Sequence, residues 1–376
     1  MSFIKHEGIS RRCALKAIGT TAGVLAFSCG FPLVSPSVLA LEARLRDIAS
    51  RKGLLYGCAT TKEHLTQDKA FASLLVQQVD LLVPEADMKW KALEPTPGTF
   101  NFDSGDWLLN FARNNKLRMD GSVLVWHEAL PSWFTNIDPK KARSAMIDHI
   151  RKVVGHYKGK VFSWTVVNEG VAFRGSGEEM KDTPFLRLLG PDYVDIAFRT
   201  AAEADSNVML VYNDNHLEYD IPEDEYRRNV LLKLLKTWLG KGIPIHALGI
   251  QSHLRTGNVP FSAKKLRDWL KAVADLGLKL VISELDVTEK DSDKDISTRD
   301  QRIAAEVRRY LDVVLQEKAV VSVITWGLSS RYTWLTYSFP RADRQPLRPL
   351  PYDNELKPTR VWQALNDAFE SAPTRS

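Results

Sequence analysis

Cysteine is scarce in this chain, since only three of its 376 residues are cysteines. Two of them, Cys13 and Cys29, fall near the N-terminus, so the rest of the chain holds only Cys58. A segment with a single cysteine has no intrachain disulfide and cannot supply the paired cysteines of a structural zinc site. Cys58 ends an apolar stretch, and we expect it to lie in the core rather than to react.

The chain also lacks a strong excess of charge of one sign. Without residues 1–40, 47 Lys and Arg residues face 45 Asp and Glu residues. Nucleic-acid-binding domains normally show clustered Lys and Arg, and this balance gives no sign of such a surface. We therefore expect neither a nucleic-acid partner nor, once the N-terminal segment is removed, a membrane partner.

Motifs that bind common cofactors are absent too. The sequence has no P-loop, no dinucleotide-binding glycine motif and no nucleophile motif around a serine or cysteine. The histidines show no His-x-His or His-x-x-x-His spacing, which argues against a catalytic metal. No Pro-, Gly- or Ser-rich linker divides the chain. We predict one domain over residues 41–376, with no cofactor and no metal.

Residues 1–40 are organised like an export signal. A segment with two consecutive arginines, residues 10–16, precedes an uncharged apolar run from Ala17 to Leu39. This pattern resembles a bacterial twin-arginine signal peptide, with small residues for cleavage around Ala40. A retained membrane anchor is the alternative, because the run is nearly long enough to span a bilayer. Gly23, Gly30, Pro32 and Pro36 interrupt it and favour cleavage, which predicts a periplasmic or secreted protein.

From residue 53 onward, short apolar runs alternate with longer amphipathic ones. The short runs mostly lack strict alternation, as expected for strands buried on both faces. Repeated strand–helix units are typical of a parallel (β/α)₈ TIM barrel, the α/β fold that we predict. A doubly wound open sheet is the alternative, but no glycine-rich loop follows the first strand. The predicted strands are Leu54–Ala59, Leu81–Glu85, Gly121–Trp126, Ser163–Asn168, Val208–Asn213, Ala247–Ser252, Lys279–Glu284 and Val321–Trp326.

The longer runs place apolar side chains three and four residues apart, which is the spacing of an amphipathic helix. Ser297 and Thr298 are suitable N-caps for one of these helices. Helices are predicted over Lys140–Tyr157, Asp224–Leu239, Phe261–Ala274 and Arg299–Leu315.

Polar and aromatic side chains follow most of the predicted strands at their carboxyl ends. In a parallel barrel these ends meet at one mouth, where active sites lie. One polar residue after a strand is usually a turn or a helix cap, but repeated occurrence predicts a functional site. The residues concerned are Glu85, Trp126, His127, Asn168, Glu169, Asn213, Asp214, Gln251, His253, Glu284, Asp286 and Trp326.

Two of these residues are glutamates suited to acid–base chemistry. Glu169 and Glu284 each follow an apolar run that would anchor and partly bury them. Burial raises the pKa of a carboxyl group, and a second carboxylate nearby raises one of the two further. Glycoside hydrolysis with retention needs such a pair, because one group gives a proton to the leaving oxygen while the other, ionised, attacks the anomeric carbon. We therefore predict this chemistry, with a raised pKa for the proton donor.

Aromatic residues near the predicted mouth favour a carbohydrate ligand. Sugar rings have apolar faces that stack on aromatic side chains, and Trp suits an open cleft. Lys89, Asn168, Gln251 and His253 would bind sugar hydroxyls, while Asp286 would orient His253. The tryptophans concerned are Trp90, Trp126, Trp133, Trp326 and Trp334, with a core position as the alternative for Trp133.

Several of these residues lie in motifs that resemble glycoside hydrolase family 10, a family of retaining xylanases built on a (β/α)₈ barrel. The similarity runs from Gly57 to Leu365, and the motifs occur in the family's order. They are the second-strand block (residues 84–102), the third (124–133), Trp164–Glu169, Gln251–Leu254, Ile282–Asp286, Trp326 and Trp334.

The resemblance implies a role for each residue of the site. Glu169 would be the general acid/base, and Glu284 would be the nucleophile that forms a glycosyl-enzyme. Asn168 would bind the 2-hydroxyl of the sugar, while Glu85 and Lys89 would contact sugars on the non-reducing side. The substrate-binding set is Glu85, Lys89, Trp126, Asn168, Gln251, His253, Trp326 and Trp334.

Four positions depart from the motifs of this family. Ala86 stands where Asn is usual, Ser122 where His is usual, and Thr165 where Asp is usual. The fifth-strand block ends in Asn215-His216 instead of Tyr-Asn. Each lost hydrogen bond to a sugar would cost about 1 kcal/mol. We therefore expect either weaker activity on xylan or a modified xylo-oligosaccharide as the substrate.

The predicted function is a retaining endo-β-1,4-xylanase that acts as a monomer on a polysaccharide or oligosaccharide. Another β-1,4-glycanase or an exo-acting β-glycosidase is an alternative within the same chemistry. A catalytically weak glycan-binding barrel is the alternative from another class. The intact pair Glu169 and Glu284 favours the enzyme.

Overall fold

The computed structural model describes residues 44–289 and 295–375. The predicted signal peptide, residues 1–40, lies outside this part of the chain. Among the described residues, no helix has both the length and the apolar character needed to cross a membrane. The described residues belong to one compact unit, Glu42–Ser376.

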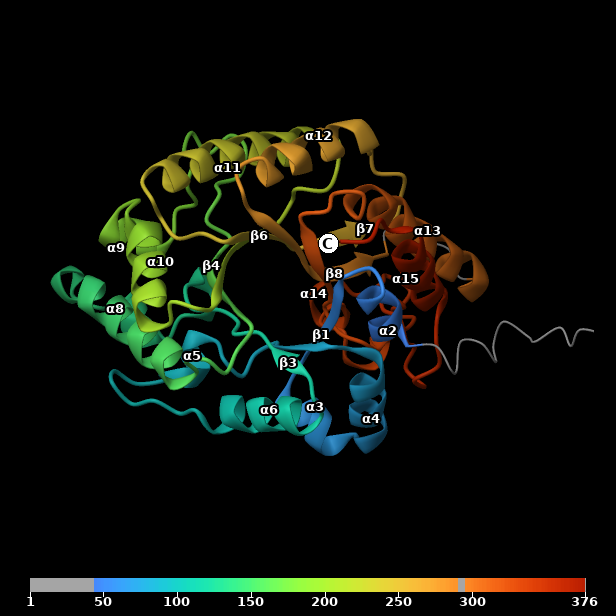
Figure 1. The fold of residues 1–376 in the computed structure, drawn as a ribbon, viewed down its shortest axis with the longest axis horizontal. Coiled ribbons are helices and arrows are strands. Elements are labelled where there is room, and N and C mark those ends of the chain that lie inside the picture. Colours follow the sequence, from blue (N-terminus) through green and yellow to red (C-terminus); the bar gives the residue numbers. More distant parts are fainter. Residues whose placement is uncertain (1–43, 290–294, 376) are drawn as a thin grey trace, which may run out of the picture. The chain divides into compact units, whose positions relative to one another are not determined.

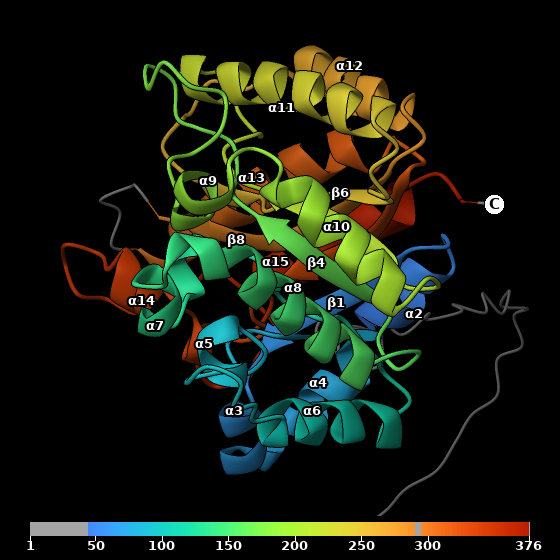
Figure 2. The same ribbon diagram turned by 90° about the vertical axis from the view of Figure 1, so that its left-hand side faces the viewer.

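The apolar runs form a parallel sheet that curls around a common axis (Figures 1 and 2). Neighbouring strands follow the order β3-β2-β1-β9-β8-β6-β5-β4, and the short β7 pairs with β8. The strands are β1 (Leu55–Thr60), β2 (Leu81–Pro84), β3 (Arg118–Met119), β4 (Ser163–Asn168), β5 (Met209–Asp214), β6 (Ala247–Ile250), β7 (His253–Arg255), β8 (Lys279–Thr288) and β9 (Val320–Thr325).

The segment after β3 closes the ring against β4. Isolated parallel bridges join Gly121 to Trp164 and Val125 to Val167. This closure confirms the (β/α)₈ barrel and excludes the open sheet. The predicted third strand, Gly121–Trp126, is wrong in its extent, because its pairing with β4 is interrupted between the two bridges and only Arg118–Met119 forms a regular strand.

Helices surround the strands on the outside, and α11 and α12 run side by side (Figures 1 and 2). The helices are α2 (Leu45–Ser50), α3 (Lys62–Gln67), α4 (Lys69–Gln78), α5 (Trp90–Leu93), α6 (Asp103–Asn114), α7 (Ser132–Thr135), α8 (Pro139–His156), α9 (Pro184–Leu189), α10 (Tyr193–Ala204), α11 (Pro222–Gly240), α12 (Ala263–Ala274), α13 (Ile296–Val314), α14 (Leu335–Ser338) and α15 (Arg360–Ser371). Short 3₁₀ turns occur at His127–Ala129 and Ser330–Tyr332.

The four predicted helices are confirmed as α8, α11, α12 and α13, close to their predicted bounds. The predicted N-cap of α13 is wrong, because Ser297 and Thr298 lie inside its first turn. The cap is Asp295, whose carboxylate accepts a hydrogen bond of 2.7 Å from the Thr298 backbone N–H.

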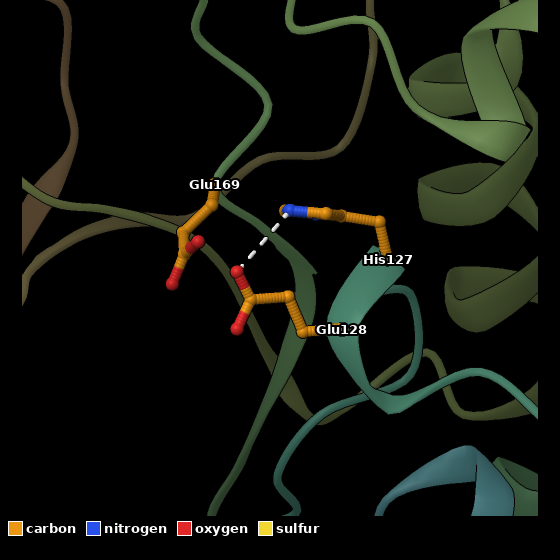
Figure 3. Close-up of side chains that lie close together, drawn as sticks. All are labelled: His127, Glu128 and Glu169. Atoms are coloured by element: carbon orange, nitrogen blue, oxygen red, sulfur yellow. Dashed lines mark ion pairs between the residues drawn. The ribbon is translucent and has the colours of Figure 1, made fainter. Parts of the chain in front are cut away.

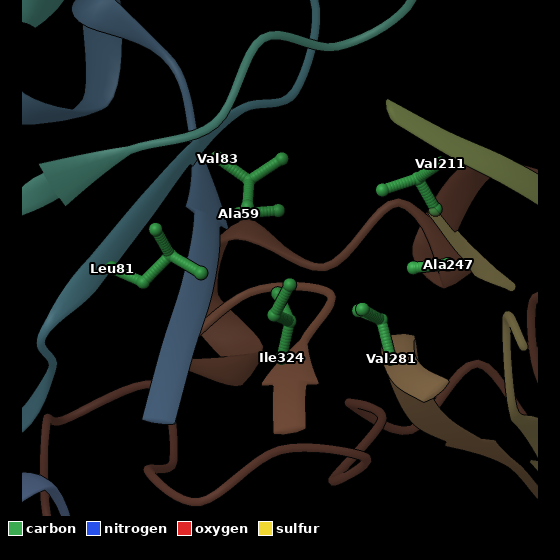
Figure 4. Packing of buried hydrophobic residues seen from close by; sticks show 7 residues of the cluster. All are labelled: Ala59, Leu81, Val83, Val211, Ala247, Val281 and Ile324. Atoms are coloured by element: carbon green, nitrogen blue, oxygen red, sulfur yellow. The ribbon is translucent and has the colours of Figure 1, made fainter. Parts of the chain in front are cut away.

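Apolar side chains from β1, β2, β5, β6, β8 and β9 lie in the interior of the barrel (Figure 4). We call the following residues the barrel core: Ala59, Leu81, Val83, Val211, Ala247, Val281 and Ile324. They are branched or small side chains on inward-facing strand positions, which is typical of a parallel barrel. Cys58 is buried and free, which confirms its predicted core position. The barrel core is the floor on which the mouth is built.

The contact between Gly121 and the Trp164 indole leaves no room for a side chain. A Cβ at residue 121 would overlap the Trp164 ring, which is fully buried. We expect Gly121→Ala to lower the free energy of unfolding by about 1–3 kcal/mol, as overpacking does. Urea unfolding measures this loss. The control is Gly155→Ala in α8, where an added Cβ meets no atom within 4 Å and should not destabilise the helix. Equal stability of the two variants would contradict the proposed packing role.

Candidate functional site

A cavity of about 490 Å³ opens at the carboxyl ends of the barrel strands. The predicted catalytic and substrate-binding residues all line it, although they come from distant parts of the chain. They are Glu85, Lys89, Trp126, Asn168, Glu169, Gln251, His253, Glu284, Trp326 and Trp334. Asp286, the predicted orienting residue, is buried behind His253.

Two residues with left-handed backbone shape the mouth. Glu169 follows β4 with a φ of 59°, and its N–H donates to the Asn213 carbonyl at 2.9 Å. Ser252 has a φ of 64° and separates β6 from β7, so that Gln251 and His253 both line the cavity. Non-glycine residues rarely adopt this conformation, and when they do the strain is often found at functional sites.

A chain of amide side chains links the two glutamates. Asn213 Nδ2 donates to Glu284 Oε1 at 2.8 Å and to Asn168 Oδ1 at 2.9 Å. Gln251 Nε2 donates to the same Asn168 oxygen at 3.2 Å and to Glu169 Oε1 at 3.0 Å. We call Asn168, Asn213 and Gln251 the amide relay. The sequence placed Asn213 at a strand end but gave no sign that it contacts Glu284.

Glu284 is also held from its other side. His253 Nε2 lies 3.2 Å from Glu284 Oε2, and His253 Nδ1 lies 2.8 Å from Asp286 Oδ1. Trp334 Nε1 donates to the second Asp286 oxygen at 2.7 Å. Burial alone would lower the pKa of His253, but the Asp286 and Glu284 carboxylates raise it well above its ordinary value. A protonated His253 donates to both carboxylates, and the predicted contact with Asp286 is present.

Glu169 lies beside a positive charge that the sequence did not reveal. Lys181 Nζ is 3.5 Å from Glu169 Oε2. Burial acts to raise the pKa of Glu169, but the hydrogen bond from Gln251 and the charge of Lys181 outweigh it and lower that pKa below its ordinary value. The prediction of a raised pKa for the proton donor is therefore wrong, because these partners stabilise the ionised form.

His127, Glu128 and Glu169 lie together at one side of the mouth (Figure 3). Each offers one potential metal ligand, and the three ligand atoms lie within 4.8 Å of one another. Burial and the charge of Lys181 lower the pKa of His127 to about 4. Lys181 already supplies a positive charge next to this group, which disfavours a divalent cation. The expectation that the protein uses no metal stays a prediction.

Glu85 and Lys89 form a second charged pair in the cavity. Burial raises the pKa of Glu85 to about 7, against the opposing charge of Lys89. The Lys89 ammonium lies 4.7 Å from the centre of the Trp126 ring, in cation–π contact. An ammonium group, a carboxyl group and an aromatic face together suit a polyhydroxylated ring ligand.

Trp90 and Trp133 do not belong to the mouth, which corrects their expected position. Trp90 is buried, stacks on His149 at 3.9 Å between ring centres, and donates to the Glu94 carboxylate at 3.1 Å. Trp133 is half-buried, and its Nε1 donates to the Glu94 carbonyl at 3.0 Å. Glu94 thus accepts a hydrogen bond from both indole N–H groups, and neither ring lines the cavity.

Comparison with known proteins gives one consistent result. The model of the family described as "Glycosyl hydrolase family 10" matches residues 44–368. A "Beta-1,4-xylanase" of Dictyoglomus thermophilum is 31% identical over 354 residues, covering 91% of this chain and 96% of the relative. "Endo-1,4-beta-xylanase 1" of Humicola insolens is 31% identical over 336 residues, covering 87% of this chain and 75% of the relative.

Solved structures agree with this result. Native xylanase 10B from Thermotoga maritima superposes with a TM-score of 0.79 at 27% identity, covering 87% of this chain and 98% of that chain. Xylanase 10B from Thermotoga petrophila RKU-1 in complex with xylobiose superposes with a TM-score of 0.78 at 27% identity, covering 87% of this chain and 97% of that chain.

The raised pKa of His253 depends chiefly on Asp286. We expect Asp286→Asn to lower the His253 pKa, because an amide keeps the shape of the side chain but removes the negative charge. A pH titration of the imidazole proton resonances by NMR measures this shift. His246, which accepts a hydrogen bond of 3.0 Å from the Leu210 N–H, is the internal control and should titrate unchanged. An unchanged His253 pKa in Asp286→Asn would show that Asp286 does not control the protonation of His253.

Proposed function

Because the chain belongs to glycosyl hydrolase family 10, we propose that it is a retaining endo-β-1,4-xylanase that hydrolyses xylan or xylo-oligosaccharides. The observation that carries this proposal is the amide relay, which joins two buried or half-buried glutamates at the mouth of the barrel. The names of the relatives support the choice of substrate. The complex of the Thermotoga petrophila structure with xylobiose supports it too.

The first step breaks the glycosidic bond. Glu284, oriented by Asn213 and His253, attacks the anomeric carbon and forms an ester with the sugar. Glu169 gives its proton to the departing oxygen as the glycosidic C–O bond breaks. Asn213 and His253 each donate a hydrogen bond to the Glu284 carboxylate and hold it in position. The carboxylate therefore needs little reorganisation during attack.

The second step releases the sugar. Glu169, now ionised, removes a proton from water, and the water oxygen attacks the anomeric carbon while the bond to Glu284 breaks. Lys181 and Gln251 stabilise this ionised form of Glu169. Two displacements at one carbon restore the original configuration, so the product first appears as the β-anomer.

The remaining cavity residues bind the glycan. Asn168 binds the 2-hydroxyl of the sugar at the cleavage point, and its amide oxygen is positioned by Asn213 and Gln251. Glu85 and Lys89 contact sugars on the non-reducing side. Trp126, Trp326 and Trp334 provide aromatic faces for the sugar rings.

Residues 1–40 serve as a twin-arginine export signal in this proposal, and the mature enzyme works as a monomer in the periplasm or outside the cell. Degradation of a polysaccharide outside the cytoplasm requires such export, since the polymer does not cross a membrane. The absence of a second cysteine after residue 40 suits a chain that folds before export.

The roles of Glu169 and Glu284 are distinguished by how strongly the activity of each alanine variant depends on the leaving group of the substrate. On xylan, we expect Glu169→Ala and Glu284→Ala each to lose activity by about 10²–10⁴-fold or more. With an aryl β-xylobioside that carries a good leaving group, Glu169→Ala should lose far less in the first step, because such a group departs without protonation. Glu284→Ala should lose activity on both substrates.

Three results would contradict these assignments. Release of no reducing sugar by the wild-type protein from any glycan would reject the enzyme, and cleavage of β-cellobiosides alone would reject the xylanase. Glu128 lies beside Glu169 and is the other carboxyl group that could give a proton. A Glu128→Gln variant that loses as much activity as Glu169→Gln would therefore contradict the assignment of Glu169 as the proton donor. NMR of the fresh product should show the β-anomer.

Lys181 controls the pH at which Glu169 holds its proton. Removing this positive charge destabilises the ionised form, so Lys181→Met should raise the Glu169 pKa. Because the first step needs protonated Glu169, the alkaline limb of the kcat/KM profile should move to higher pH. Lys181→Arg keeps the charge and is the matched control. An alkaline limb that stays in place in Lys181→Met would contradict this role.

A further inference from the structure

The cavity does not end at the two glutamates but continues downward into the barrel. Four small polar or acidic side chains line this deeper part on the side of β4 and the segment before it: Asp120, Ser122, Ser163 and Thr165. Ser163 Oγ donates to Asp120 Oδ1 at 2.6 Å. We call this space the lower chamber. Its presence beneath the acid–base pair means that a bound sugar has room below it.

The Ser122 and Thr165 hydroxyls of the lower chamber are available to a ligand. Among the hydrogen bonds of the described residues, none involves the side-chain oxygen of Ser122 or Thr165. Both residues line the cavity, so each hydroxyl can donate to a group placed there. Thr165 lies on β4 three positions before Asn168, the residue proposed to bind the 2-hydroxyl. The ring position next to that hydroxyl is the 3-hydroxyl.

The remaining wall of the lower chamber is apolar. It consists of Val83, Val211, Val281 and Ile324, four members of the barrel core that also line the cavity (Figure 4). No Lys or Arg lies among these eight lining residues, so none of them would balance the charge of an anion. Burial raises the pKa of Asp120 to about 7, so in weakly acidic solution this group is protonated and able to donate. The chamber therefore offers donors for one acceptor oxygen and contacts for a small apolar group.

We propose that the lower chamber accepts a short uncharged ester, such as an acetyl group, on the 3-hydroxyl of the sugar whose anomeric carbon is attacked. The Ser122 and Thr165 hydroxyls donate to its carbonyl oxygen, and its methyl group lies against the valines and Ile324. The ester takes no part in the reaction and stays on the product. This inference rests on the proposed xylanase function and names the substituted glycan that its site takes.

The test uses one acetylated xylan, divided into a native portion and a portion deacetylated with base. The sugar at the attacked position becomes the reducing end of the product. Wild-type enzyme should therefore release oligosaccharides with an acetyl group on the reducing-end xylose, seen by mass spectrometry and NMR in weakly acidic buffer that slows ester migration. Oligosaccharides with a uronic-acid substituent at that sugar should not be cut there.

Two variants separate filling of the lower chamber from loss of its hydrogen bonds. Ser122→Leu fills the space, and Thr165→Val keeps the shape but removes a donor. Each should lower the ratio of rates on acetylated over deacetylated xylan by about tenfold, the effect of roughly 1.4 kcal/mol. The ratio is measured within one variant, so partial misfolding does not change it.

The outcomes distinguish failure of the two proposals. No cleavage of deacetylated xylan would reject the proposed function itself. Cleavage of deacetylated xylan together with acetyl groups found only on inner sugars, never on the reducing end, would overturn the lower chamber as an ester site. An unchanged ratio in both variants would overturn it as well.

Discussion

The hydrogen bonds that Asn213 donates to Asn168 and Glu284 hold the two halves of the site together. Asn213 lies on β5 and Glu284 on β8, with β6 between them in the sheet. The Asn213 side chain crosses β6 at Gly249, where a Cβ would overlap its amide. A residue without a side chain on the intervening strand is thus what allows one amide to contact both sides of the mouth.

The two glutamates experience different electrostatic surroundings in the same cavity. Lys181 and Gln251 favour the ionised form of Glu169, whereas a protonated His253 lies beside Glu284 and is itself held by Asp286. These surroundings suit Glu169 to its role as the base of the second step. A bound glycan excludes water from Glu169, and this desolvation raises its pKa towards the value that the first step needs. The proton donor is thus prepared by substrate binding rather than by the fold alone.

The barrel and the residues at its mouth could be predicted because both follow from the order of strands and helices along the chain. Strand ends in a parallel barrel converge, so Glu85, Glu169 and Glu284 were expected to lie together without knowledge of loop paths. The direction of the Glu169 pKa could not be predicted, because Lys181 returns to the site through an irregular loop with no periodic pattern. Trp90 was misplaced for a related reason: only the fold shows that Glu94 and His149 enclose it.

The departures at Ser122 and Thr165 have two physical consequences that act in opposite directions. Ser122 stands where His is usual, which removes a hydrogen bond to an unsubstituted sugar worth about 1 kcal/mol. Ser122 and Thr165 also line the lower chamber, which reaches the barrel core. Burial of one methyl group contributes about 0.8 kcal/mol, and a hydrogen bond to a carbonyl adds about 1 kcal/mol. A substituted sugar would recover what a plain one loses, so the lost contacts and the open space favour the same substrate.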